Sequence, residues 1–183
     1  MKYFIYGLVF IFFSIFVEIP YLDLEIQILP AFVGYLILIK PIRTFKKIEK
    51  SFEEIEYLSM AMFIFTLIEF ISGIVQFDLM FKNEWVTSIL HPVTTMVIPL
   101  FITYRIIWSL RNIEFSKEIP MDTEPLTQLW IYLFIIFVVG LFLNDSLFIS
   151  IVTLASYLVK TMIIYYLSRS IKLYKVHSQG DLS

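Results

Sequence analysis

Long runs of apolar residues, separated by short polar segments, dominate the pattern along the chain. A helix needs about 20 apolar residues to cross a bilayer, with about 17–25 tolerated. Backbone N–H and C=O groups in hydrocarbon must be paired internally, so such runs are expected to be helices. The sequence therefore predicts an all-α, polytopic transmembrane helical bundle, with six spans arranged as three hairpins in a single membrane domain, 1–183. The expected spans are residues 3–19, 24–40, 57–77, 86–107, 127–143 and 146–167.

The second run, residues 24–40, carries Pro30 near its start, so a re-entrant loop is an alternative to a full crossing. The distribution of positive charge favours the crossing. All but two of the 14 Lys and Arg residues fall on one side of the expected topology, the exceptions being Lys82 and Lys160. Because basic residues concentrate in cytoplasmic loops, both termini are predicted to be cytoplasmic.

Between the second and third spans, apolar residues recur at steps of three and four, which is one face of a helix. These residues are Ile42, Phe45, Ile48, Phe52 and Ile55. The pattern predicts an interfacial amphipathic helix over about residues 42–56, with its apolar face in the headgroup region. Its basic residues, Arg43, Lys46, Lys47 and Lys50, would lie against anionic headgroups. A docking face for a cytoplasmic partner fits the same pattern.

Composition supports the membrane class and excludes several others. The chain is 59% apolar and 16% charged, with a mean hydropathy of +0.83, whereas soluble domains are about 45–50% apolar and about 25% charged. The net charge of −2 gives no basic field for nucleic acid. The absence of cysteine excludes disulfides, thiolate metal sites and cysteine nucleophiles.

The residue sets that intramembrane enzymes use are not found in the sequence. The two histidines, His91 and His177, are far apart, and a single histidine does not make a zinc site. The five glycines are scattered, so no glycine-rich loop is present to hold phosphate. The sequence therefore predicts a protein that is not an enzyme and has neither a metal nor a cofactor.

Polar residues inside the expected spans form stripes at helical spacing. A charge at the centre of a membrane helix costs roughly 2.5–3.5 kcal/mol, so Glu69 and Lys160 are the strongest candidates for a functional site. A structural ion pair between them, predicted to meet inside the bundle, is the alternative, and His91 is the other partner considered for Glu69. Ordinary helix–helix contact is the alternative for the Ser and Thr positions. The candidate intramembrane polar site comprises Thr66, Glu69, Gln76, His91, Thr94, Thr153, Tyr157 and Lys160.

Residues 28–37 contain the run Leu29-Pro30-Ala31-Phe32-Val33-Gly34-Tyr35. This run resembles a Leu-Pro-Asp-Phe-x-Gly-Tyr segment in uncharacterised small multi-pass membrane proteins of Gram-positive bacteria. Ala31 occupies the position of the acid in that segment, and the resemblance covers about ten residues. Six helices in a chain of this length also look like the vitamin-binding subunits of energy-coupling importers. Those subunits carry an Ala-x-x-x-Ala contact in their first helix, which here contains no alanine.

These observations lead to two functional expectations. The first is a non-catalytic integral protein of the bacterial cytoplasmic membrane, acting as an accessory, regulatory or immunity-type subunit with a membrane protein partner or as a homo-oligomer. It rests on short loops, no soluble domain and no catalytic motif. The alternative is a small-solute or ion permease component, such as the substrate-binding subunit of an importer, that uses the intramembrane polar face.

Overall fold

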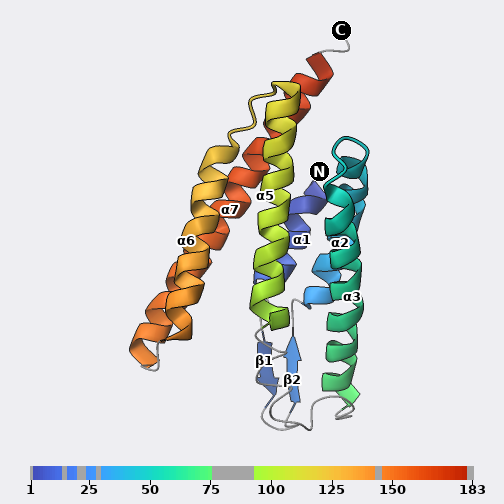
Figure 1. The fold of residues 1–183 in the computed structure, drawn as a ribbon. Coiled ribbons are helices and arrows are strands. Elements are labelled where there is room, and N and C mark those ends of the chain that lie inside the picture. The colour runs from blue at the N-terminus through green and yellow to red at the C-terminus, as the bar shows by residue number, and fades with distance from the viewer. Residues whose placement is uncertain are drawn as a thin grey trace. The chain divides into compact units, whose positions relative to one another are not determined.

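A computed structural model describes residues 2–13, 16–19, 24–27, 30–75, 93–142 and 146–180. The chain divides into two compact units, Met1–Ile102 and Thr103–Ser183, and each is described by itself. Figure 1 shows the elements along the chain. In order they are α1 (Lys2–Phe12), β1 (Phe16–Ile19), β2 (Leu24–Gln27), α2 (Ala31–Lys46), α3 (Phe52–Val75), the π-helix η1 (Val93–Val97), α5 (Ile98–Lys117), α6 (Thr123–Leu141) and α7 (Ser146–Gly180).

Four helical segments within the described residues are long and apolar enough to cross a membrane. They are Phe52–Ser72, Val93–Lys117, Thr123–Leu141 and Ser146–His177. These segments overlap the last four of the six expected spans, with shifted boundaries. The prediction of long apolar helices that could cross a membrane is therefore confirmed, whereas the number of six spans and the orientation of the termini stay predictions.

The first two apolar runs, residues 3–19 and 24–40, differ from the continuous helices expected there. Helix α1 ends at Phe12, and β1 pairs with β2 in an antiparallel two-stranded sheet. The sequence Leu24-Glu25-Ile26-Gln27 alternates apolar and polar residues, which is the period of a strand. Pro30 is extended, with φ −70° and ψ 128°, and α2 begins at Ala31. A proline disfavours the helical conformation in the residue that precedes it, so a helix is not expected to continue through this point.

Helices α1 and α2 pack at a close crossing between two glycines. A Cβ added to Gly34 would lie 2.7 Å from the carbonyl oxygen of Gly7, and one added to Gly7 would lie 2.9 Å from that of Gly34. Side chains at these positions would therefore collide with backbone rather than with movable atoms. Small residues at a helix crossing allow this approach and gain dispersion contacts between the two backbones. The glycines thus bring the buried side chains of Leu8 and Leu38 into the core of the first unit.

The segment 42–56 is not the single interfacial helix that its periodicity predicts. Helix α2 continues to Lys46, a turn follows, and α3 begins at Phe52. The apolar residues of the expected lipid-facing surface are mostly buried inside the resulting helical hairpin, and the rings of Phe45 and Phe52 stack 5.3 Å apart. The single continuous helix is therefore wrong, because the apolar faces of α2 and α3 pack against each other across the turn. The interfacial position of the segment stays a prediction.

Candidate functional site

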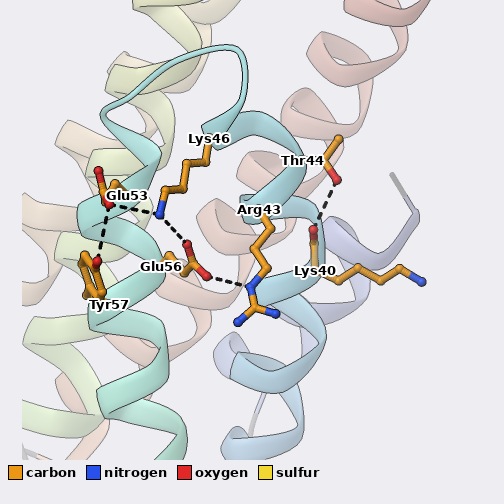
Figure 2. A network of polar contacts seen from close by, with 7 residues as sticks. All are labelled: Lys40, Arg43, Thr44, Lys46, Glu53, Glu56 and Tyr57. Atoms are coloured by element: carbon orange, nitrogen blue, oxygen red, sulfur yellow. Dashed lines mark hydrogen bonds and ion pairs between the residues drawn. The ribbon is translucent and has the colours of Figure 1, made fainter.

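Five side chains at the α2–α3 turn form a network that we call the polar clasp: Arg43, Lys46, Glu53, Glu56 and Tyr57 (Figure 2). The Nε atom of Arg43 lies 2.6 Å from Oε1 of Glu56, and the Nζ atom of Lys46 lies 3.1 Å from its Oε2. Lys46 also pairs with Oε1 of Glu53 at 3.1 Å, and the Tyr57 hydroxyl donates to the same oxygen at 3.4 Å. The clasp therefore ties the last turn of α2 to the first two turns of α3.

Glu56 is the centre of the polar clasp. Only 10% of its side chain is exposed, compared with 58% for Arg43 and 33% for Lys46. Both of its oxygens accept hydrogen bonds from cations. These bonds compensate for the hydration that the carboxylate loses on burial. The contacts with Glu53 and then Glu56 raise the pKa of the Lys46 ammonium above its ordinary value of 10.5. While Glu53 and Glu56 are ionised, this stabilisation is complete below pH 10.5 and declines as the pH rises further, so the ion pairs are present at neutral pH.

We expect Glu56→Gln to lower the apparent Tm in detergent by about 2–4 °C. The substitution removes the charge that both cations share and leaves one amide oxygen as an acceptor. Lys47→Gln is the matched control, because Lys47 is an exposed cation one residue beyond Lys46. Thermal unfolding of the two variants, followed by circular dichroism, gives the comparison. Equal shifts in both would show that the clasp contributes nothing specific.

The polar clasp changes the expected arrangement of the basic residues at this turn. Of the four cations predicted to face anionic headgroups, Arg43 and Lys46 are paired with glutamates, whereas Lys47 and Lys50 are exposed. Lys40, one turn before Arg43, is also exposed, and its Nζ lies 5.0 Å from the centre of the Tyr3 ring. Apart from Arg43 and Lys46, the exposed cations among the described residues at this end of the first unit are Lys2, Lys40, Lys47 and Lys50.

The residues predicted to form the intramembrane polar site are divided between the two units. Thr66, Glu69 and Thr94 belong to the first unit, whereas Thr153, Tyr157 and Lys160 belong to the second. Gln76 and His91 lie outside the described residues. Because Glu69 and Lys160 are in different units, their pairing stays a prediction.

Within each unit the structure shows what some of these residues contact. Thr66 is buried, and its hydroxyl donates to the Met62 carbonyl oxygen at 2.7 Å, a bond within its own helix. Thr94 is buried in η1, and Thr153 is exposed on α7. The structure brings Tyr157 and Lys160 together: the Nζ of Lys160 lies 5.3 Å from the centre of the Tyr157 ring. The face of the Tyr157 ring stabilises the Lys160 cation, which lies far from both ends of a long apolar helix.

A second polar cluster, not predicted from the sequence, closes the loop between α5 and α6. Oε1 of Glu114 accepts from the backbone N–H groups of Met121, at 2.8 Å, and Asp122, at 3.0 Å. Its Oε2 accepts from the backbone N–H of Thr123, at 3.3 Å, and from the Thr123 hydroxyl. Asp122 in turn pairs with Arg169 of α7 at 2.7 Å. A carboxylate from α5 thus satisfies N–H groups at the start of α6, where the helix dipole is positive.

Asp and Thr are common N-cap residues, and Asp122 and Thr123 both lie at the start of this helix. The structure places Asp122 at the N-cap in a left-handed conformation, with φ 54°, and its side chain makes no capping bond. Glu114 takes that role from eight residues earlier in the chain. Capping patterns are local in sequence, so a cap supplied by another helix leaves no signal that periodicity or spacing can detect.

The described residues of the run 29–35 have packing roles in this structure. The Phe32 ring lies 5.0 Å from that of Phe70 and 6.4 Å from that of Phe63, both on α3. Gly34 makes the close approach to α1, and Tyr35 is 1% exposed. Pro30 is extended and immediately precedes α2. Gly34 thus packs α2 against α1, and Phe32 packs it against α3.

Within the described residues, no group of three or more His, Asp or Glu side chains is arranged to hold a metal ion. Comparison of the chain with protein-family models, with curated proteins and with solved structures gave no match. The functional argument therefore depends on the geometry of the chain itself.

Proposed function

We propose that the protein is a non-catalytic, multi-pass protein of the bacterial cytoplasmic membrane that acts as an accessory, regulatory or immunity-type subunit. Its N-terminus and its C-terminus would both lie on the cytoplasmic side, where most of the basic residues collect. Two of its acidic side chains, Glu56 and Glu114, hold helix ends in place. Charged groups used in this way contribute to the scaffold rather than to a reaction.

The observation that carries this proposal is the exposure of α7. Only 6% of its most apolar stretch is buried, compared with 44% for the segment Val93–Lys117. Large side chains are exposed along its length, including Leu147 at 65%, Leu154 at 63% and Leu158 at 61%. A helix this open offers an apolar surface to lipid and to the helices of another membrane protein. A subunit role uses that surface for association by close packing.

Site-specific photo-crosslinking in native membranes tests the proposed role. Leu147, Leu154 and Leu158 are seven and four residues apart and so share one face of α7. A photoreactive residue at any of them should yield a discrete adduct with one other membrane protein. The same residue at Leu133, which is buried at 4% exposure, is the control and should yield none. Deleting the protein should then lower the abundance or the activity of the crosslinked partner. Adducts with lipid alone at every position would contradict the proposal, and adducts only with a second copy would indicate a homo-oligomer instead.

A permease component is the second candidate, and the position of Lys160 favours it. This cation lies 14 residues after the start of a helix long enough to cross the membrane. Intramembrane charges are commonly retained where they serve a solute or ion pathway. In this alternative, Glu69, His91 and Lys160 would contribute to a binding face within the bilayer.

A further inference from the structure

Helices α1 and α2 run in opposite directions, so the start of α1 lies beside the end of α2. The Phe4 ring lies 5.9 Å from the Phe45 ring, whereas Gly7 meets Gly34 farther from that end. Both helices therefore contribute side chains to the surface near the α2–α3 turn. The exposed side chains of this surface can be compared level by level along the two helices.

At this end of the two helices, Lys40 and Tyr3 form an exposed pair outside the polar clasp. The Nζ of Lys40 lies 5.0 Å from the centre of the Tyr3 ring, and Tyr3 is 50% exposed. Figure 2 shows the Lys40 side chain directed away from the residues of the clasp. The ring holds the ammonium in place without neutralising its charge. In the part of the chain that the structure describes, neither Lys40 nor Lys47 pairs with a carboxylate, so both cations are available to an external anion.

The exposed side chains on this surface change from apolar to cationic over a short distance. One turn nearer the glycine crossing, Leu36 and Tyr6 are 53% and 52% exposed. In the other direction along α2, Thr44 and Lys47 are exposed. Leu36, Thr44 and Lys47 are four or seven residues from Lys40, so they share its face of the helix. From Leu36 to Lys47 this face is about 16 Å long, at a rise of about 1.5 Å per residue.

This order of groups matches the order of groups in a phospholipid. An acyl chain fits the apolar level, and the phosphate fits the lysines, whose long side chains place their charge at headgroup depth. Tyrosine is enriched between these levels, at the membrane–water interface. A free phosphate or an acidic peptide would contact the lysines and leave the exposed Leu36 and Tyr6 without a partner. The apolar level next to the cations therefore favours an anionic amphiphile.

We propose that this α1–α2 surface, which we call the lipid face, binds an anionic phospholipid. Leu36 and Tyr6 contact an acyl chain. Lys40 and Lys47 bind the headgroup, and Tyr3 positions the Lys40 ammonium. The site differs from the headgroup contact expected from the sequence, which used the cations of segment 42–56 and neither Lys40 nor Tyr3. It is independent of the accessory role proposed above, because a bound lipid is compatible with either candidate function.

Native mass spectrometry of the delipidated protein in detergent tests the lipid face. The protein is titrated with phosphatidylglycerol or phosphatidylcholine, with and without inorganic phosphate, and the Kd of the first bound lipid is measured. We expect phosphatidylglycerol to bind more tightly. Lys40→Gln should weaken its binding about fivefold, which corresponds to about 1 kcal/mol for a lysine near an anionic headgroup. Lys172→Gln removes an exposed cation from α7 instead, and this matched control should leave the Kd unchanged.

A phosphatidylglycerol with a photoreactive acyl chain then locates the bound lipid, and its crosslink should map to α1 or to residues 31–40 of α2. Tyr3→Leu retains every charge, so it should weaken binding by less than Lys40→Gln does. Circular dichroism and the Kd for phosphatidylcholine, which should not change, show whether each variant is folded. Lys47→Gln provides a second reading if Lys40→Gln is misfolded.

Four results would overturn the proposal. Equal affinity for the two lipids would show that the headgroup charge is not recognised. Equal losses in Lys40→Gln and Lys172→Gln would show attraction to charge in general. Displacement of the lipid by inorganic phosphate would indicate a site for a free anion. A crosslink only outside α1 and α2 would place the lipid on another surface.

Discussion

Replacing Gly34 by leucine is expected to force α1 away from α2 and to lower the free energy of unfolding by about 3 kcal/mol. The first added carbon would already lie 2.7 Å from the Gly7 carbonyl oxygen and 2.8 Å from side-chain carbons of Phe10 and Ile11. Neither helix can yield locally, because the nearest atom belongs to backbone. Gly34→Ala should produce a smaller loss of the same sign. Thermal unfolding in detergent, with limited proteolysis at the α1–α2 end, measures both variants.

Gly140→Ala is the matched control for this prediction. A Cβ at Gly140 would lie 3.4 Å from a methyl carbon of Val152, which is an ordinary van der Waals contact. Alanine also favours helix over glycine by about 1 kcal/mol, so this variant should be neutral or slightly more stable. If Gly34→Leu unfolded at the same temperature as the original protein, the close α1–α2 crossing would be wrong.

The lengths of the apolar runs predict much of the fold, because the length that a run needs to cross the membrane is set by the bilayer more than by neighbouring elements. The four long apolar helices could be predicted for this reason, although their boundaries shift by several residues. Residues 16–19 and 24–27 could not, since a strand of four residues within an apolar run resembles a helix in composition. The turn between α2 and α3 could not be predicted either. Its residues, Lys47-Ile48-Glu49-Lys50-Ser51, contain neither glycine nor proline to mark a break.

The polar contacts show a similar division between local and non-local information. The basic and acidic residues of segment 42–56 are evident in the sequence, but their pairing across a turn requires the turn to be known. A periodic apolar face indicates a helix without indicating what covers it, so Phe45 and Phe52 fit a headgroup layer and a helical hairpin equally well. For the intramembrane candidates, Tyr157 and Lys160 are three residues apart on one helix and are found together.

Removing the Glu114 carboxylate should open the α5–α6 loop and destabilise the second unit. Glu114→Ala removes the acceptor of three backbone N–H groups and of the Thr123 hydroxyl. Thr123 is 1% exposed, so water does not readily replace the lost acceptor. Loss of a helix cap costs about 0.5–2 kcal/mol, and hydrogen bonds to charged groups contribute about 1.5–3 kcal/mol. We therefore expect a loss of about 2–3 kcal/mol in the free energy of unfolding.

Hydrogen exchange separates this cap from a general effect of charge. In Glu114→Ala, the amides of Met121, Asp122 and Thr123 should exchange much faster, whereas those in the middle of α7 should not change. Glu114→Gln keeps one oxygen, so it should retain part of the protection. Glu118→Gln removes an exposed carboxylate from the same loop and should leave exchange unaltered. Unchanged exchange at residues 121–123 in Glu114→Ala would show that another group holds the start of α6, and Arg169, which pairs with Asp122, would then be the next residue to replace.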